Sequence, residues 1–372
     1  MQKRIIADYI PLFAMAMLLS FGRTGFMPFV EITPIDQAIN VIIVVIAPLL
    51  ILFRQLILKE KILNKSIFPL IIIWAYIILR LLVSSSKYRA TELSTIISIV
   101  LSIYLGSQVT ILQLRQLRLL MYAVAVFFSF YALIYAQKDI SNILSKTLKV
   151  RLGADYSSSI LVAYPRMLYM LVLTCFVTAV VEEKIWLKIG ALSVTIIPIM
   201  IALSTGGRGA LVGLICAIFV FILGRRQPKF PLIGIVFAVL ILFIIYNFVS
   251  EYLPLMNERI EDADDAGRSY IYLDAISNIS LIGRGIGQNY AHNIFLEFLQ
   301  DYGIVGLCLF LYVFTKAIIS VSKLYSSSGN VELLWVISLF TLQLIAQQLS
   351  LNIFCDMFWA SFVIPLCISD SE

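Results

Sequence analysis

Residues 189–223 read IGALSVTIIPIMIALSTGGRGALVGLICAIFVFIL, which is two long apolar runs joined by a short polar turn around Arg208. A helix needs about 20 mostly apolar residues to cross a bilayer, and each run approaches that length. The apolar residues are continuous and do not alternate with polar ones, as they would in the strands of a membrane barrel. This stretch therefore predicts two membrane helices that meet with almost no loop between them.

The rest of the chain has the same character. Of its 372 residues, 61% are hydrophobic and 13% are charged, whereas soluble domains are about 45–50% apolar and about 25% charged. These values exclude a soluble globular enzyme, a disordered chain and a disulfide scaffold. We expect an all-α, polytopic integral membrane protein in which residues 1–372 form a single membrane-embedded domain. Segment 250–292 is expected to be a large outer loop that contains short helices.

Twelve spans are predicted along the chain, at approximately 5–21, 35–53, 67–83, 93–113, 119–136, 159–181, 189–203, 209–223, 230–249, 293–315, 331–348 and 354–369. The segments between them alternate between the two sides of the membrane. The first set contains the N-terminus, 54–66, 114–118, 182–188, 224–229 and 316–330, and the second set contains 22–34, 84–92, 137–158, 204–208, 250–292 and 349–353.

Fifteen of the 28 basic residues lie in the first set, so the positive-inside rule places that set in the cytoplasm. Because the number of spans is even, both termini are then cytoplasmic. The other thirteen basic residues (28 − 15), most of them arginine, fall toward the outer side. Either the assignment of sides is wrong at some loop, or the outer face binds anions, since arginine is well suited to bidentate contact with phosphate.

Arg208 is the first candidate functional residue. It follows two glycines and stands where the second apolar run begins, so it is expected at membrane depth at the start of a helix. Helix amides and a guanidinium group together form an anion site. The alternative is an arginine whose side chain extends to the outer headgroups.

The outer loop offers further candidates. Its acidic cluster, 258–265, lacks the pattern of a calcium loop, and we interpret it as a solvated charged face. Arg268 follows, and residues 270–276 are predicted to form a short helix along the membrane surface. The glycines of Gly283–Gly287 resemble a dinucleotide fingerprint, but no strand–turn–helix unit surrounds them. We expect them to allow the backbone to approach another segment closely.

His292 is the only histidine in the chain and stands where the outer loop enters a predicted span. Its imidazole is the one side chain whose ordinary pKa lies near neutrality, so it is the natural proton acceptor, although a lone histidine is often structural. Asn293, Glu297 and Asp301 follow at intervals of four and share roughly one helix face. A single histidine without a cysteine cluster excludes a histidine-rich metal site, and we expect neither a metal nor a cofactor.

Four elements occur here in a characteristic order: Thr205–Ala210, a large outer loop, His292–Asn293 and Tyr302–Leu307. In this order they resemble the O-antigen ligase/polymerase superfamily of bacterial membrane glycosyltransferases, over about residues 200–310. The resemblance implies glycan transfer from undecaprenyl pyrophosphate on the periplasmic side of the inner membrane, without a metal or a nucleotide sugar.

The resemblance also implies roles for individual residues. Arg208 and Arg268 would hold the pyrophosphate, and His292 would activate the acceptor hydroxyl. Arg151, in Arg151-Leu152-Gly153, resembles an arginine-glycine element of an earlier outer loop, but lacks the Pro-Asn that often follows it. The further candidates for substrate binding are Arg284, Asn293 and Glu297.

The preferred hypothesis is a polymerase that joins lipid-linked repeat units of O-antigen, capsule or exopolysaccharide, with inversion at the anomeric carbon. The alternative within the same chemistry is the ligase that moves O-antigen onto lipid A-core. A transporter or flippase is the alternative of a different class. The expected partners are undecaprenyl-pyrophosphate-linked oligosaccharides and membrane lipids, and the sequence leaves open whether a chain-length regulator binds. The net charge of +6 is attributed to anionic lipid rather than to nucleic acid.

Overall fold

The computed structural model describes residues 2–21, 46–58, 65–83, 89–135, 141, 158–204, 208–225, 268–285, 293–349 and 355–368. Within these ranges the regular structure is entirely helical, which confirms the all-α prediction. The α-helices are α1 (Gln2–Phe21), α3 (Ala47–Leu58), α4 (Phe68–Val83), α5 (Arg89–Gly106), α6 (Leu114–Tyr135), α8 (Ser158–Val181), α9 (Ile185–Ser204), α10 (Arg208–Gly224), α12 (Arg268–Ser277), α13 (Ile294–Ser328), α14 (Val331–Leu349) and α15 (Asp356–Cys367), with short 3-10 turns at Lys65–Ile67 and Ile111–Gln113.

Six of these segments are long and apolar enough to cross a bilayer: Lys65–Val83, Ile111–Ile134, Tyr164–Val181, Ile185–Leu203, Ile294–Ser328 and Val331–Gln348. Five shorter apolar helices accompany them: Tyr9–Ser20, Ala47–Ile57, Thr95–Gly106, Gly209–Gly224 and Met357–Cys367. Each of these segments overlaps one of the predicted spans, whereas the predicted span 230–249 lies outside the described residues. The chain is therefore a multi-pass membrane protein, and a total of twelve spans stays a prediction.

The helices pack around α8, whose apolar window Tyr164–Val181 is 89% buried. Helix α9 packs along α8, and α10 packs along α14. The second contact is close because Gly213 has no side chain, and a Cβ there would overlap the carbonyl oxygen of Leu342. Small residues are common where membrane helices approach each other in this way.

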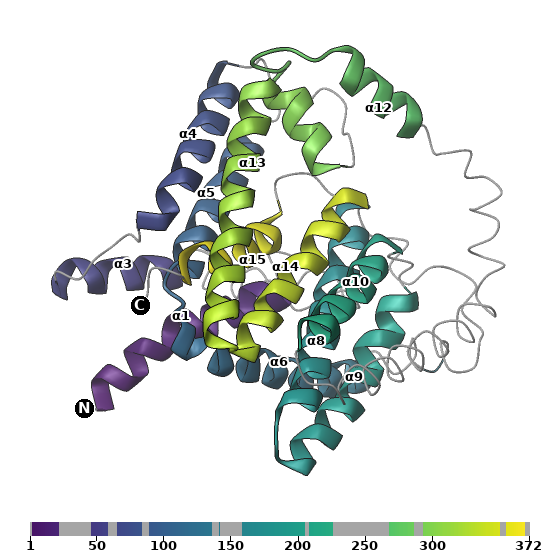
Figure 1. Ribbon diagram of the computed structural model, residues 1–372. Coiled ribbons are helices and arrows are strands. Elements are labelled where there is room, and N and C mark those ends of the chain that lie inside the picture. Colours follow the sequence, from purple (N-terminus) through teal and green to yellow (C-terminus); the bar gives the residue numbers. More distant parts are fainter. Residues whose placement is uncertain are drawn as a thin grey trace.

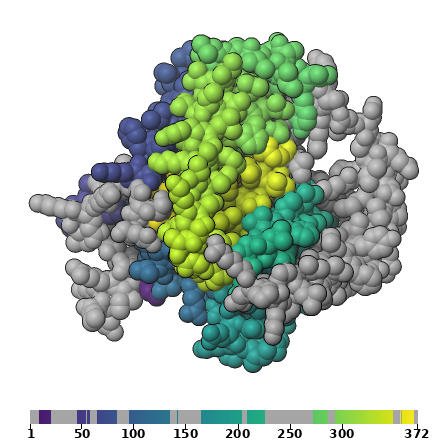
Figure 2. All heavy atoms as spheres, viewed as in Figure 1, coloured from purple at the N-terminus to yellow at the C-terminus, as the bar shows by residue number. Residues whose placement is uncertain are grey.

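Helices α4 and α13 stand side by side, and α12 lies near the upper end of α13, on the side away from α4, in Figure 1. In the space-filling view, α13 forms a continuous surface from the region of α12 down toward the teal helices at the lower end of the molecule (Figure 2). Its exposed side chains include Leu311, Tyr312, Ile318 and Ile319. Exposed apolar side chains on a membrane helix are suited to contact with lipid.

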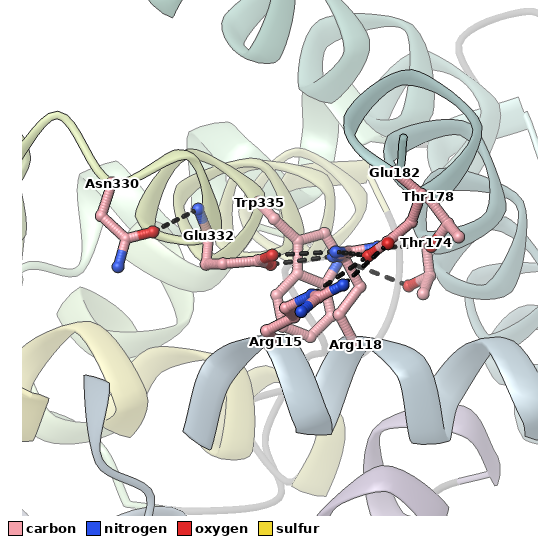
Figure 3. A network of polar contacts seen from close by, with 8 residues as sticks. All are labelled: Arg115, Arg118, Thr174, Thr178, Glu182, Asn330, Glu332 and Trp335. Carbon is pink, nitrogen blue, oxygen red and sulfur yellow. Dashed lines mark hydrogen bonds and ion pairs between the residues drawn. The ribbon is translucent and has the colours of Figure 1, made fainter. Parts of the chain in front are cut away.

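A buried network of charges joins three helix ends, and the sequence did not reveal it. The side chain of Arg118, on α6, is completely buried and donates to Glu332 at the start of α14 and to Glu182 just after α8 (Figure 3). Arg118 also donates to the hydroxyl of Thr178, and Arg115 donates to Glu182 from the exposed side. Two arginines thus face two carboxylates, which balances the charge in a site of low polarity.

This network corrects the predicted boundaries. Segment 114–118 was expected to be a loop whose basic residues are exposed, but it forms the first turn of α6, and Arg118 is buried there because two carboxylates compensate its charge. Segment 316–330 was also expected to be a loop, but α13 continues to Ser328 and ends at Gly329, whose left-handed φ of 63° is typical of a helix C-terminus.

The long-range polar contacts join segments that the alternation places on the same side. The buried charge network links 114–118 and 182–188, both of the first set, with Glu332, which stands just after segment 316–330 of the same set. At the opposite ends of their helices, Arg166 on α8 donates to Gln347 and to the carbonyl oxygen of Ala346 on α14. Which of these two sides faces the cytoplasm stays a prediction.

Candidate functional site

Helix α13 is two helices joined at a sharp bend. Gly303 has φ 71° and ψ −169°, which no helical residue adopts. The ring of Phe298 stacks on Phe310 at 4.5 Å between centroids, and Phe295 lies 6.1 Å from Phe314. Since residues further before the bend meet residues further beyond it, the two parts fold back on each other like the limbs of a hairpin, as Figure 1 shows.

The predicted span over 293–315 is found as part of Ile294–Ser328, but the bend at Gly303 interrupts it. Residues 294–302 form a half-helix, about 13 Å long at 1.5 Å per residue, which runs back from the bend beside the longer limb. Residues 304–328 form that longer limb, which is long enough to cross about 30 Å of hydrocarbon. Asn293 consequently lies near the level of Phe314 on the long limb. It is separated from the bend by the whole length of the half-helix.

The loop before α13 crosses the bend and completes its backbone hydrogen bonds. A helix that breaks leaves carbonyl groups without partners on one side of the break and N–H groups on the other. The carbonyls of Gln300 and Asp301 accept from the N–H groups of Arg284 and Gly285, at 2.8 and 3.1 Å. Beyond the bend, the N–H groups of residues 304 and 305 donate to the carbonyls of residues 280 and 281, both at 3.1 Å.

Two glycines make this crossing possible. Gly283 has φ 75° and Gly303 has φ 71°, and both values strain a residue that carries a side chain. A Cβ at Gly283 would overlap the backbone of Asp301, and a Cβ at Gly303 would overlap the backbone of Gly283. The prediction that the glycines of 283–287 allow close backbone approach is thus confirmed at Gly283, and the segment approached is the bend of α13.

Helix α4 supports the crossing from the side. The hydroxyl of Tyr76 donates to the carbonyl oxygen of Tyr302 at 2.9 Å, which is the last carbonyl of the half-helix. One turn further along α4, Nη2 of Arg80 donates to the carbonyl oxygen of Gly283 at 2.9 Å. The three carbonyls that end the half-helix are therefore all hydrogen-bonded, two by the loop and one by α4.

Asn293 is the N-cap of the half-helix. Its Oδ1 accepts from the N–H groups of Phe295 and Leu296, at 3.0 and 3.2 Å, as an N-cap side chain does. This capping positions the residue that follows His292 in the sequence. The contact of Asn293 with a substrate, predicted from the sequence, stays a prediction.

The half-helix carries three buried polar side chains. Glu297, in its first turn, and Asp301, just before the bend, are buried on one face, as the spacing predicted. A carboxylate in a first turn is stabilised by the positive end of the helix dipole. Gln300 is 1% exposed, and neither atom of its amide has a hydrogen-bond partner among the described residues. So polar a limb inside a membrane bundle is costly and is typical of functional sites.

The structure describes the side chain of only one of the predicted site arginines, and the backbone of two others. Arg284 is described in full: its Nη1 lies 3.1 Å from Oδ2 of Asp274 in a partly exposed ion pair. Helix α10 begins at Arg208 and α12 at Arg268, so the helix start expected at Arg208 is confirmed, as is the short helix near 270–276. The side chains of Arg208 and Arg268 lie outside the described part of the structure, as do Arg151 and His292 entirely. The joint role of His292, Arg208 and Arg268 that the resemblance implies therefore stays a prediction.

Sequence reasoning missed Tyr76, Arg80 and the bend itself. Arg80 stood among the arginines on the outer side, but nothing in its neighbourhood connected it with a segment more than 200 positions away. The bend had a signal, because Gly303 stands where the polar residues Gln300 and Asp301 give way to the apolar run that begins at Ile304. A glycine in a helical pattern is tolerated often enough that this signal alone predicts no break.

Residues 191–311 match the family model described as O-antigen ligase. The match supports the assignment of the chain to the O-antigen ligase/polymerase superfamily. It begins within α9 and ends on the long limb of α13, so it includes the start of α10, all of α12, the crossing loop and the bend. No curated protein matches the chain.

Proposed function

We propose that this chain, whose residues 191–311 match the O-antigen ligase family, is a polysaccharide polymerase of the bacterial inner membrane. It would transfer a glycan from undecaprenyl pyrophosphate to a sugar hydroxyl of a lipid-linked acceptor at the outer face. The observation that carries the proposal is that the matched segment contains both the Arg208 helix start and the α13 hairpin. The first brings an arginine to the start of a predicted span, and the second carries buried polar side chains into the bundle.

The proposed reaction is a direct displacement at the anomeric carbon of the donor sugar. The acceptor oxygen forms a bond to that carbon while the bond from the carbon to the pyrophosphate oxygen breaks. His292 takes the proton of the acceptor hydroxyl, a form of base catalysis worth about 10²–10⁴-fold. Undecaprenyl pyrophosphate leaves with its charge held by Arg208 and Arg268, so guanidinium groups stabilise the leaving group electrostatically.

The hairpin supports this assignment of roles. Because the half-helix runs back from the bend, its N-terminal amides and Asn293 lie inside the bundle, at a distance of about 13 Å from the crossing loop. A helix N-terminus favours anions, and a recessed site excludes water that would compete with the acceptor hydroxyl. Arg151, Arg284, Asn293 and Glu297 are proposed to contact the donor or the acceptor sugars.

The purified protein in liposomes, supplied with a radiolabelled lipid-linked repeat unit, tests the proposal. We expect products that grow by whole repeat units on undecaprenyl pyrophosphate, with loss of growth in His292→Ala and Arg208→Ala. Lys316→Ala, a change of charge on the long limb of α13, is the control and should leave growth intact. Transfer only to added lipid A-core would instead identify a ligase. Growth that survives both His292→Ala and Arg208→Ala would refute the enzymatic role of these residues.

The stereochemistry of the product is a second test of the mechanism. A single displacement inverts the anomeric configuration of the donor sugar. We expect the new linkages to have the opposite configuration, as measured by the one-bond carbon–hydrogen coupling in NMR spectra of the polymer. Retention of configuration would rule out direct attack of the acceptor hydroxyl.

A transporter is the second candidate, and the broken helix α13 is the observation that favours it, because discontinuous helices line the binding sites of many transporters. The same liposomes distinguish it. Movement of a labelled lipid-linked oligosaccharide between leaflets, without formation of a new glycosidic bond, would support transport and contradict the polymerase.

A further inference from the structure

We propose that Tyr76 and Arg80 of α4 are positioning residues, which fix the bend of α13 and thereby the position of the half-helix, whose N-cap Asn293 follows the proposed base His292 in the sequence. The inference rests on the proposed function for the role of His292. It rests on the structure alone for the contacts that hold the bend.

The half-helix packs on the long limb through its aromatic rings, and the loop that crosses the bend is hydrogen-bonded to it. Four backbone hydrogen bonds join 280–285 to 300–305, so these two segments form one unit. Tyr76 and Arg80 tie that unit to a separate membrane helix, by bonds of 2.9 Å to the carbonyls of Tyr302 and Gly283. The ring of Tyr76 also lies 6.4 Å from the ring of Tyr302.

A small tilt of the half-helix at the bend causes a larger displacement of its far end. Its far end, at Asn293, lies about 13 Å from the bend, so a tilt of about 10° at the bend moves that end by about 2 Å. A displacement of about 1 Å between reacting groups can reduce a rate by about 10²-fold. Small losses of restraint at Tyr76 or Arg80 are therefore expected to act on the chemical step.

A matched control exists at the other end of the same helix. The hydroxyl of Tyr325 donates to the carbonyl oxygen of Gly224 at 2.7 Å, which is also a tyrosine-to-backbone bond between distant segments. Tyr325→Phe removes a bond of the same type from the long limb, far from the bend. It therefore reports what the loss of such a bond costs when only packing is affected.

The first experiment compares steady-state kinetics in liposomes with a lipid-linked repeat unit as donor. We expect Tyr76→Phe to lower kcat about 10-fold or more with the donor KM within about twofold of wild type, and Arg80→Gln to act in the same direction. Arg80→Lys should restore most of the rate, because its ammonium can donate to the carbonyl of Gly283. Tyr325→Phe should leave kcat within about twofold. An unchanged kcat in Tyr76→Phe, or an equal loss in Tyr325→Phe, would overturn the inference.

The second experiment measures the position of the half-helix directly. Spin labels are attached to Leu296→Cys on the half-helix and Ile196→Cys on α9, with the five native cysteines replaced, and the distance distribution is recorded by pulsed electron resonance. Tyr76→Phe and Arg80→Gln should shift or broaden the distribution, and Tyr325→Phe should not. A distribution unchanged by Tyr76→Phe would refute the positioning role. If wild type transfers no glycan, the proposed function fails, while this measurement still decides whether α4 positions the half-helix.

Discussion

Arg118 and Glu332 form a bidentate ion pair although they lie 214 positions apart in the chain. Nε and Nη2 of the arginine are each 2.8 Å from a carboxylate oxygen, and the arginine side chain is completely buried. The pair joins the start of α6 to the start of α14, and Glu182 adds the end of α8 (Figure 3). A buried arginine that loses its acidic partner retains an uncompensated charge, so this contact has a large effect on the assembly of three membrane helices.

Glu332→Gln should therefore lower the free energy of unfolding by about 3–5 kcal/mol, the usual cost of removing one member of a buried ion pair. Unfolding of the protein in detergent micelles, followed by circular dichroism during denaturant titration, measures the change. Glu183→Gln is the control, since Glu183 is exposed beside the network and should shift the value by less than about 0.5 kcal/mol. Similar losses in the two variants would show that the pair is not stabilising.

The network also predicts a dependence of stability on pH. The hydrogen bond from Arg115, aided by that from Arg118, holds the pKa of Glu182 below its ordinary value, although burial opposes this shift. A carboxyl whose pKa is lowered by folding contributes stability that is fully present above its unfolded pKa and is lost as the pH falls through the folded value. Thermal midpoints should thus fall on acidification below about pH 4.3, and less steeply in Glu182→Gln. An equal slope in both proteins would contradict the assignment.

The crossing glycines should be more sensitive to substitution than another glycine of positive φ. Gly303→Ala combines the strain of a backbone conformation almost confined to glycine (φ 71°, ψ −169°), about 1–3 kcal/mol, with overlap against the backbone of Gly283. Gly329 provides the comparison, because its φ is 63° but a Cβ there meets no atom within 4 Å. We expect Gly303→Ala to lower the unfolding midpoint in micelles clearly more than Gly329→Ala does. Equal midpoints would mean that the crossing loop separates from the bend at little cost.

Hydropathy predicted the helices well because a run of apolar residues has few alternatives to a helix in a bilayer. It failed where polar residues are compensated by distant partners. The first turn of α6 was assigned to a loop because of Arg118, whose partners come from two other helix ends. Such pairs are a property of the packed bundle and leave no local pattern in the sequence.

In the candidate site, too, the features with local sequence signals could be predicted, and those that depend on distant contacts could not. The helix start at Arg208 and the short helix beginning at Arg268 could be predicted from local signals, namely glycines before an apolar run and interfacial tyrosines. The bend at Gly303 could not, because its stability depends on backbone groups of 280–285 and on Tyr76. The polar face of Asn293, Glu297 and Asp301 was recognised from its spacing. That this face lies on a folded-back half-helix follows only from the contacts of Phe295 and Phe298 with the long limb.

Arg284 offers a test of whether the crossing loop contacts substrate. Its ion pair with Asp274 is partly exposed, with side-chain exposures of 26% and 20%, and such pairs contribute only about 0–1 kcal/mol to stability. Arg284→Ala should therefore leave the unfolding midpoint nearly unchanged. If the guanidinium binds the donor pyrophosphate as proposed, the same change should raise the donor KM several-fold. Asp274→Asn should lower the donor KM, because it releases the arginine from a competing carboxylate. A donor KM that stays constant in both variants would confine Arg284 to its contact with Asp274 and exclude it from the substrate site.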